Sequence, residues 1–319
     1  MTNDESTYTI DCDEVVHTIE FSPYEWSSQL IAIGTDYTVT ITACRFQEES
    51  KEVEDFEYSQ LRQFHHGTRV TALSWSPATS LSIVPKLVRF VTAGADHKLR
   101  IFSSDLKDDD SVKLLEGHTC YVNGVTFDPD KGNQIASVGD DQTCRVWGED
   151  GVQTVCFPLG SPGMGVCWHH EEPMKILVAQ KNGIVRIYSL HNQQPIMSLD
   201  CGTSPLMAVD WCYHNCLAVG VVTGPDWFIF DTSRSSRPIE SHQAHAEGCR
   251  SFRWSKSSEN LIASTGRPGC QLKVFNLRNQ KVAVNKTLQI SNGLSWHFRL
   301  PVVAVGGDKK VHLWFVETS

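Results

Sequence analysis

The sequence predicts an all-β protein built from seven similar units. Short runs of alternating apolar and polar residues are separated by breaks rich in Gly, Pro, Asn and Asp, the pattern of antiparallel strands joined by tight turns. A run that ends in an aromatic residue recurs along the chain. The last four of these aromatics are spaced 43, 43 and 42 residues apart, at Trp168, Trp211, Trp254 and Trp296. A period of this length indicates one supersecondary unit used many times.

Each unit contains the same elements in the same order. The first strand ends in the recurring aromatic residue, which is in turn Phe21, Trp75, Phe127, Trp168, Trp211, Trp254 and Trp296. Two further strands follow, joined by a turn that contains Gly, Asp or Asn. These hairpins are LIAIGTDYTVTI (30–41), FVTAGADHKLRIF (90–102), IASVGDDQTCRVW (135–147), ILVAQKNGIVRIY (176–188), LAVGVVTGPDWFIF (217–230), LIASTGRPGCQLKVF (261–275) and VVAVGGDKKVHLW (302–314).

Such small sheets must stack, because one four-stranded sheet cannot bury both of its faces alone. Seven units of roughly 42 residues use nearly the whole chain, and this is the requirement of a β-propeller. We therefore expect a single seven-bladed propeller over residues 1–319. After Trp314 only FVETS remains, too little for an outer strand, whereas YTIDC at 8–12 precedes the first unit. We expect this N-terminal strand to complete the last blade and remove an exposed sheet edge.

Composition and charge exclude several classes of function. The chain is 40% hydrophobic and 20% charged, which is typical of a globular protein, and its net charge of −9 argues against direct binding to nucleic acid. Its N-terminus is acidic, and no run approaches the length of a membrane span, so neither secretion nor membrane insertion is expected. The 11 cysteines lack paired spacing. Cys212, His214 and Cys216 lack a fourth ligand, so we expect no metal and no cofactor.

Four residues of the third unit could be mistaken for a hydrolase triad. They are His118, Ser137, Asp141 and Trp147, within GHTCYVNGVTFDPDKGNQIASVGDDQTCRVW. A catalytic serine needs an exposed hydroxyl and an oxyanion hole, and no GxSxG element surrounds Ser137. The pattern instead resembles the WD40 repeat, whose Asp, His, Ser and Trp form a buried hydrogen-bond network. The resemblance implies a structural role for these residues and no catalytic residues.

The other units carry this signature only in part. Asp96, Asn182 and Asp308 precede an aromatic residue by the same six positions as Asp141, but GH occurs only at Gly117 and His118. We expect the remaining blades to depend more on apolar packing.

The whole chain resembles one group within the WD40 family. FHHGTRVTALSWSP, SPGMGVCWH, PLMAVDWC, DWFIFDTSRSSRP and FRWSKSSENLIASTG are similar, in order, to segments of the small WD-repeat nucleoporins of the Y-shaped outer-ring scaffold of the nuclear pore. The resemblance implies a non-enzymatic scaffold subunit at the nuclear envelope. Its main partner would be a large nucleoporin built from a propeller and a helical solenoid, supporting pore assembly and transport of protein and mRNA. The resemblance also implies a kinetochore role in mitosis.

A second class of function is a WD40 adaptor, such as the substrate receptor of a ubiquitin ligase. Such receptors usually show Trp-Asp-x-Arg at the end of a blade. Here Gly148, Glu149 and Asp150 follow Trp147. The docking motif is absent, but an adaptor of another complex remains the alternative.

Candidate partner-binding residues follow from propeller geometry. Connections between blades and turns between the two middle strands converge on one face, and aromatic and arginine side chains there make good interface anchors. These candidates are Arg69, His97, Tyr121, Asp226, Trp227 and Arg267. Trp227 could equally belong to the core. A glutamate-rich insertion at about 44–64 is either a solvated loop with lengthened outer strands or a partner-contacting projection.

Overall fold

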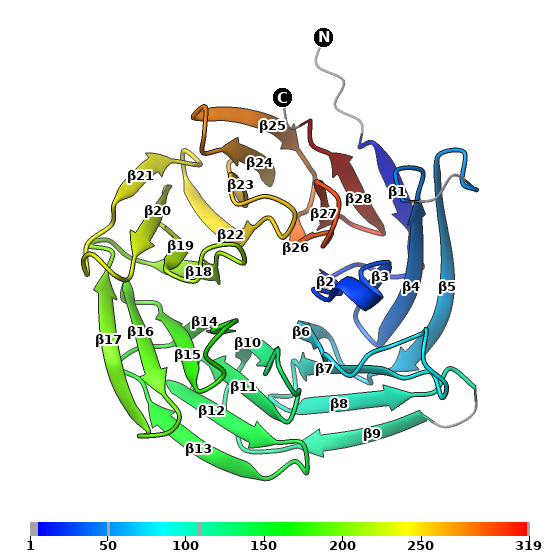
Figure 1. Cartoon of the computed structure of the whole chain (residues 1–319), viewed down its shortest axis with the longest axis horizontal. Coiled ribbons are helices and arrows are strands. Elements are labelled where there is room, and N and C mark those ends of the chain that lie inside the picture. The colour runs from blue at the N-terminus through cyan, green and yellow to red at the C-terminus, as the bar shows by residue number, and fades with distance from the viewer. Residues whose placement is uncertain (1–5, 50–51, 108–109, 318–319) are drawn as a thin grey trace.

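Seven four-stranded antiparallel sheets form a ring around a central axis (Figure 1). The computed structural model describes residues 6–49, 52–107 and 110–317. Within these ranges the only helical element is the short 3-10 helix η1 (Glu25–Ser27). The prediction of a seven-bladed propeller is confirmed. The N-terminal and C-terminal residues 1–5 and 318–319 of the predicted domain lie outside the described part, as do Ser50 and Lys51 of the acidic insertion.

Strands within each blade follow one another in sequence from the axis outwards, and we name these positions a to d. Blade 1 contains β2 (Thr18–Phe21), β3 (Leu30–Gly34), β4 (Thr38–Phe46) and β5 (Phe56–His65). Blade 2 contains β6 (Val70–Trp75), β7 (Val88–Gly94), β8 (Leu99–Ser104) and β9 (Asp110–Leu115). Blade 3 contains β10 (Val122–Phe127), β11 (Gln134–Gly139), β12 (Thr143–Gly148) and β13 (Gln153–Pro158).

The remaining blades repeat this order. Blade 4 contains β14 (Gly163–Trp168), β15 (Lys175–Gln180), β16 (Ile184–Ser189) and β17 (Gln194–Asp200). Blade 5 contains β18 (Leu206–Trp211), β19 (Ala218–Thr223), β20 (Asp226–Asp231) and β21 (Glu240–Gln243). Blade 6 contains β22 (Gly248–Trp254), β23 (Leu261–Arg267), β24 (Gln271–Asn276) and β25 (Lys281–Thr287). Blade 7 contains β26 (Asn292–Trp296), β27 (Val302–Gly306), β28 (Lys310–Phe315) and β1 (Tyr8–Asp11).

Burial along the strands explains the sequence pattern. The b strands β3 and β27 are buried at every position because neighbouring blades cover both of their faces, and they read as continuous apolar runs. The outer strand β9 is exposed except at Leu115. Burial is therefore highest in these b strands, incomplete in the axial strand β2, and low in the outer strand β9.

The hydrophobic core lies between the blades. Among the described residues, buried apolar side chains form seven clusters, and each cluster joins one blade to the next around the ring. Trp75 of blade 2 packs with Leu30 of blade 1, and Trp147 of blade 3 packs in one cluster with Ile101 of blade 2; all are almost fully buried. Each blade therefore relies on both neighbours for burial, which is why one unit cannot fold alone.

The ring has two faces that differ in their connections. The d–a connections between blades and the b–c turns lie on one face, which we call the top face. The a–b and c–d connections lie on the other, the bottom face. This division follows from the antiparallel order of the strands in every blade.

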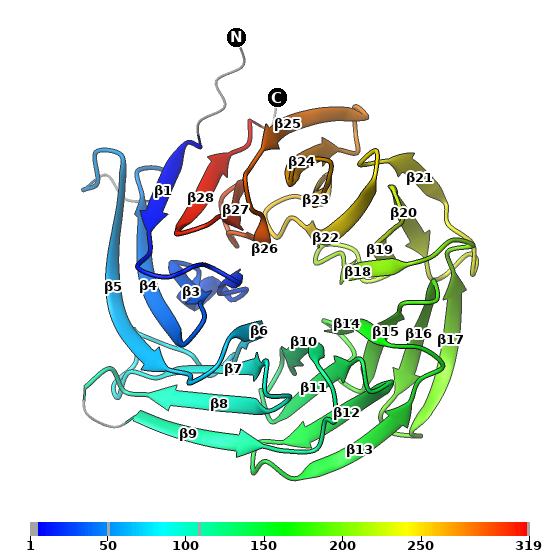
Figure 2. The ribbon, with the colours of Figure 1, turned by 180° about the vertical axis from the view of Figure 1, so that it is seen from behind.

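The first strand closes the ring by pairing with the last. β1 runs antiparallel to β28 with Tyr8 opposite Leu313 and Asp11 opposite Lys310 (Figures 1 and 2). Ile10 is only 2% exposed and enters the cluster between blades 7 and 1. The prediction that the N-terminal strand completes the last blade is confirmed, and β28 has no exposed edge.

The acidic insertion forms a long hairpin that covers this closure. β4 and β5 pair along their whole length, and Figure 2 shows them beside β1. The ring of Phe56 stacks on Tyr8 with centroids 4.8 Å apart, and Phe46, fully buried, lies 6.0 Å from Tyr8. The lengthened outer strands therefore pack apolar side chains over the joint while their glutamates stay outside.

Candidate interaction surface

A buried hydrogen-bond network spans blade 3. The imidazole Nδ1 of His118 lies 2.7 Å from Asp141 Oδ2, and its Nε2 lies 2.8 Å from Ser137 Oγ. The indole N–H of Trp147 donates to the same Ser137 oxygen at 2.9 Å. The serine hydroxyl can therefore accept from Trp147 and donate to His118, while His118 donates to Asp141.

The environment of this network is structural rather than catalytic. The side chains of His118 and Asp141 are 1% and 2% exposed, and Ser137 is fully buried. Burial lowers the pKa of His118, outweighing the opposing effect of Asp141. Burial acts to raise the pKa of Asp141, but hydrogen bonds from Thr143 and His118 outweigh it, so the net shift is downward. The network ties the d–a connection to the b–c turn, and no substrate reaches the serine.

Two other blades contain a reduced form of the network. In blade 2, His66 Nε2 lies 2.9 Å from Thr92 Oγ1, and in blade 6, His245 Nε2 lies 3.0 Å from Ser264 Oγ. No indole or carboxylate is hydrogen-bonded to either pair among the described residues, so the expectation that these blades depend more on apolar packing stays a prediction. The signal missed in blade 6 is the spacing, because His245 and Ser264 are 19 residues apart, as are His118 and Ser137.

Five of the six candidate partner-binding residues offer accessible side chains at the top face. Arg69, Tyr121 and Arg267 are exposed, and His97 and Asp226 are partly exposed. His97, at φ 67° in the b–c turn of blade 2, contacts Tyr121 of the next d–a connection, with ring centroids 5.1 Å apart. These two form one contact across blades 2 and 3. Arg267, at the end of β23 in blade 6, and Asp226, at the start of β20 in blade 5, come from other blades.

Trp227 does not belong to this surface, which corrects its prediction as a partner-binding residue. Its side chain is 2% exposed and packs in the cluster between blades 5 and 6. The indole lies 4.9 Å from His242 and 6.0 Å from Phe275, measured between ring centroids. Its position in a c strand covered on both faces explains the burial.

Exposed apolar side chains gather on the bottom face, which the sequence reasoning did not consider. Several lie in the a–b connections, with exposures of 51% for Trp26, 66% for Ile83, 88% for Val84 and 41% for Tyr213. On the top face Tyr37 and Tyr121 are the exposed aromatics among the described residues. The molecule therefore offers two chemically different faces to partners.

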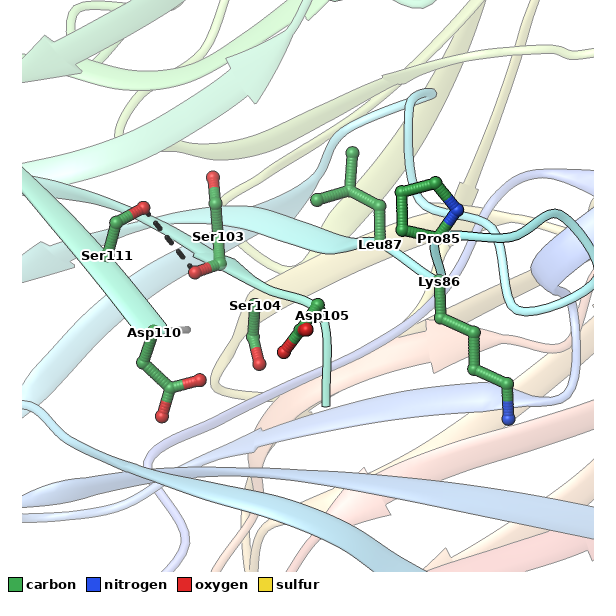
Figure 3. A pocket seen from close by; sticks show the side chains of 8 residues that line it. All are labelled: Pro85, Lys86, Leu87, Ser103, Ser104, Asp105, Asp110 and Ser111. Carbon is green, nitrogen blue, oxygen red and sulfur yellow. Dashed lines mark hydrogen bonds between the residues drawn. The ribbon is translucent and has the colours of Figure 1, made fainter. Parts of the chain in front are cut away.

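An open pocket of about 510 Å³ lies at the edge of blade 2 (Figure 3). Its walls come from the a–b connection and from the ends of β8 and β9. The lining residues are Pro85, Lys86, Leu87, Ser103, Ser104, Asp105, Asp110 and Ser111. Ser111 donates a hydrogen bond to the carbonyl of Ser103, and Asp110 pairs with Arg62 at 2.6 Å. Two of the lining side chains thus have partners, Ser111 in the backbone of Ser103 and Asp110 in the guanidinium of Arg62.

Titratable side chains do not assemble a metal site in the described ranges. Cys212 is buried at 1% exposure, and His214 Nε2 is bonded to the carbonyl of Lys256 at 2.9 Å. The cysteine and histidine of WCYHNC therefore have separate structural environments.

Comparison with known proteins agrees with this architecture. The family model described as WD domain, G-beta repeat matches residues 58–103 and 109–148. Each match begins in the outer strand of one blade and ends in the c strand of the next, so a sequence repeat is offset from a blade by one strand. This offset is the reason that the first strand must complete the last blade.

Similarity to nucleoporins extends over nearly the whole chain. The chain is 47% identical over 317 residues to human nucleoporin Nup37, covering 98% of this chain and 97% of that protein. It is 32% identical over 320 residues to Drosophila melanogaster nucleoporin Nup37, covering 98% of each. The chain belongs to the Nup37 family of nucleoporins.

A more limited similarity links this nucleoporin to transport proteins. It is 32% identical over 147 residues to the protein transport protein sec13 of Emericella nidulans, covering 42% of this chain and 44% of that protein. The match is confined to part of the ring and reflects the shared repeat. In its described residues this nucleoporin has no helix that is long and apolar enough to cross a bilayer.

Proposed function

We propose that this protein is a non-enzymatic scaffold subunit of the Y-shaped outer-ring complex of the nuclear pore, with residues 1–319 acting as one propeller domain. The observation that carries the proposal is the near full-length similarity to nucleoporin Nup37. The burial of Ser137 within its hydrogen-bond network supports a structural role for that residue.

In this proposal the main partner is a large nucleoporin built from a propeller and a helical solenoid. The top face would contact it through Arg69, Tyr121 and Arg267, with His97 and Asp226 completing the surface. A stable contact of this kind buries about 800 Å² or more on each partner, which requires several adjacent connections. Assembly at the pore would support transport of protein and mRNA, and the same complex would reach kinetochores in mitosis.

The test is affinity purification of the tagged full-length chain under mild conditions, with mass spectrometry and imaging of the tagged protein through the cell cycle. We expect stoichiometric outer-ring nucleoporins, a nuclear rim signal in interphase and kinetochore signal in mitosis. Recovery of ligase subunits, or of no stable partner, would contradict the scaffold role and favour another WD40 adaptor.

The binding face is tested separately with the double variant R69E/R267E. Charge reversal at an interface should weaken recovery of the large nucleoporin by about tenfold or more. The control is R278E, in the c–d connection of blade 6 on the bottom face, where Arg278 is also exposed. Equal recovery of both variants would place the interface elsewhere while leaving the scaffold role intact.

A further inference from the structure

One position of the repeat differs between the two halves of the ring. The residue two places after the recurring aromatic opens the a–b connection of each blade on the bottom face. Blades 1–3 have proline there, whereas blades 4–7 have ring-bearing or cationic side chains. The latter are His170, Tyr213, Lys256 and Phe298, which we call the axial cluster.

The axial cluster is held together by direct contacts between blades. The Tyr213 ring lies edge to face with His170 at 5.2 Å and with Phe298 at 5.4 Å between centroids. The ammonium of Lys256 lies 5.5 Å from the centre of the same ring, within reach of a cation–π interaction. Four connections from four blades thus converge on one tyrosine.

Part of this cluster remains open to solvent. Tyr213 is 41% exposed, and Phe298 and Lys256 are partly exposed. The connections of blades 4 and 5 also expose Met174 and Leu217, at 45% and 43%. Grouped aromatic and aliphatic side chains of this kind are typical of binding surfaces rather than of free surface.

The charges at the cluster are positive, and no ion pair in the described ranges neutralises them. Neither Lys256 nor Arg253, which precedes it on β22, forms an ion pair with another described residue. Two acids face them. Burial raises the pKa of Glu20 to about 8, against the opposing effect of Arg253 and Lys256, and no ion pair joins Glu20 to either cation. The carboxylate of Asp210 accepts the backbone N–H of Trp254 at 2.8 Å, so it is already bound.

Lys256 and Arg253 are thus two cations without an ion pair among the described residues, in a chain whose net charge is −9. A ligand that complements both features needs a carboxylate and an apolar side chain close together. Its carboxylate would reach Lys256 and Arg253, and its apolar side chain would cover Tyr213 and Phe298. An extended peptide supplies this spacing when the residues at i and i+2, which share one face of its backbone, are one acidic and one apolar.

We propose that the axial cluster is a second docking site, on the bottom face, for an extended acidic and aliphatic peptide segment of a protein partner. This site goes beyond the proposed top-face contact and does not depend on it. A propeller with two occupied faces would join two proteins rather than terminate a complex.

Three end-blocked, fluorescently labelled hexapeptides test the proposal: Glu-Glu-Leu-Leu-Glu-Glu, Lys-Lys-Leu-Leu-Lys-Lys and Glu-Glu-Ser-Ser-Glu-Glu, each of which presents both of its residue types on each face of an extended backbone. Each is titrated with the purified full-length protein and followed by fluorescence anisotropy. We expect the Glu and Leu peptide to bind at least about tenfold more tightly than either of the others, and to weaken as salt is raised. Absence of binding by this peptide, or equal binding of all three, would overturn the proposal.

Variants then locate the site. Y213A and K256E should each weaken binding of the Glu and Leu peptide by about tenfold, the range of an interface anchor. Y121A, an equally exposed tyrosine on the top face, and R278E, a charge reversal on another connection of blade 6, are the matched controls and should leave the affinity unchanged. If Y213A lowers the midpoint of thermal unfolding, its loss of peptide binding could come from misfolding, and K256E alone then tests the site. Binding that is unaffected by K256E would overturn the site.

Discussion

Truncation of Ile10 gives a direct measure of how strongly the closing strand stabilises the ring. The side chain is 2% exposed and packs between blades 7 and 1. Ile10→Ala removes three carbon atoms from this cluster. At about 0.8 kcal/mol for each buried carbon, the transfer free energy alone is about 2.4 kcal/mol. The cavity left behind adds to this, so we expect a total loss of about 2.5–5 kcal/mol in the free energy of unfolding.

Urea unfolding followed by tryptophan fluorescence measures this loss. Trp314, one of nine tryptophans, lies on β28 beside the closing strand and is 3% exposed, so its exposure on unfolding contributes to the change in total emission. Thr9→Ala is the matched control, because Thr9 pairs with His312 in the same ladder but does not enter the core cluster. The control should change stability by less than about 1 kcal/mol.

Equal stability of the Ile10 and Thr9 variants would refute the reasoning, since it would mean that β1 contributes hydrogen bonds but little burial. Deletion of residues 1–12 extends the test. It removes the ladder as well as the side chains and leaves the edge of β28 unpaired, so we expect a larger loss than for Ile10→Ala, together with self-association. A deleted chain that stays monomeric and stable would contradict the role of the closure.

Three further predictions concern the interior. Ser137→Ala leaves the indole N–H of Trp147 without an acceptor and should cost about 1–3 kcal/mol in urea unfolding, whereas the exposed Ser111→Ala should cost almost nothing. Trp227→Ala should cost about 3–5 kcal/mol without altering partner affinity of the folded fraction; a stable variant that loses binding would contradict its burial. Stability should fall as pH drops from about 6.5 to 4, because unfolding lets buried histidines take up protons, and a urea midpoint that is constant between pH 7 and 5 would refute this. These histidines are His66, His245 and His297, and burial lowers the pKa of each one to about 4.

The architecture was predictable because its signals are local and repeated. A period of two, turn residues at fixed places and a spacing near 43 residues are all visible in the chain. The missing outer strand after Trp314 and the spare YTIDC segment together predicted the closure. The acidic insertion was predictable in position but not in role. Its glutamates are the obvious feature of the sequence, but the residues that stabilise the fold are Phe46 and Phe56, which pack against Tyr8.

The interaction residues were less predictable, for two physical reasons. Alternation of apolar and polar residues identifies exposed side chains only in a strand with one face in solvent. Both faces of β20, which carries Trp227, are covered, so the pattern could not show that Trp227 is buried. The axial cluster has a different cause. His170, Tyr213 and Phe298 come together only because the ring closes, and local sequence does not encode distances across a ring. Alignment of the repeats on their recurring aromatic would have placed all three at one position.

The pairing of β1 with β28 joins a segment that precedes all seven a strands to the third strand of the last blade. On the ribosome, blades 1 to 6 can form in order, but the closing strand has no partner until residues 310–313 have emerged. A message that ends early yields an open arc with two unpaired edges, a form that chaperones and proteases recognise. The fold thereby couples its own stability to translation as far as β28, because the ring closes only when that strand is present.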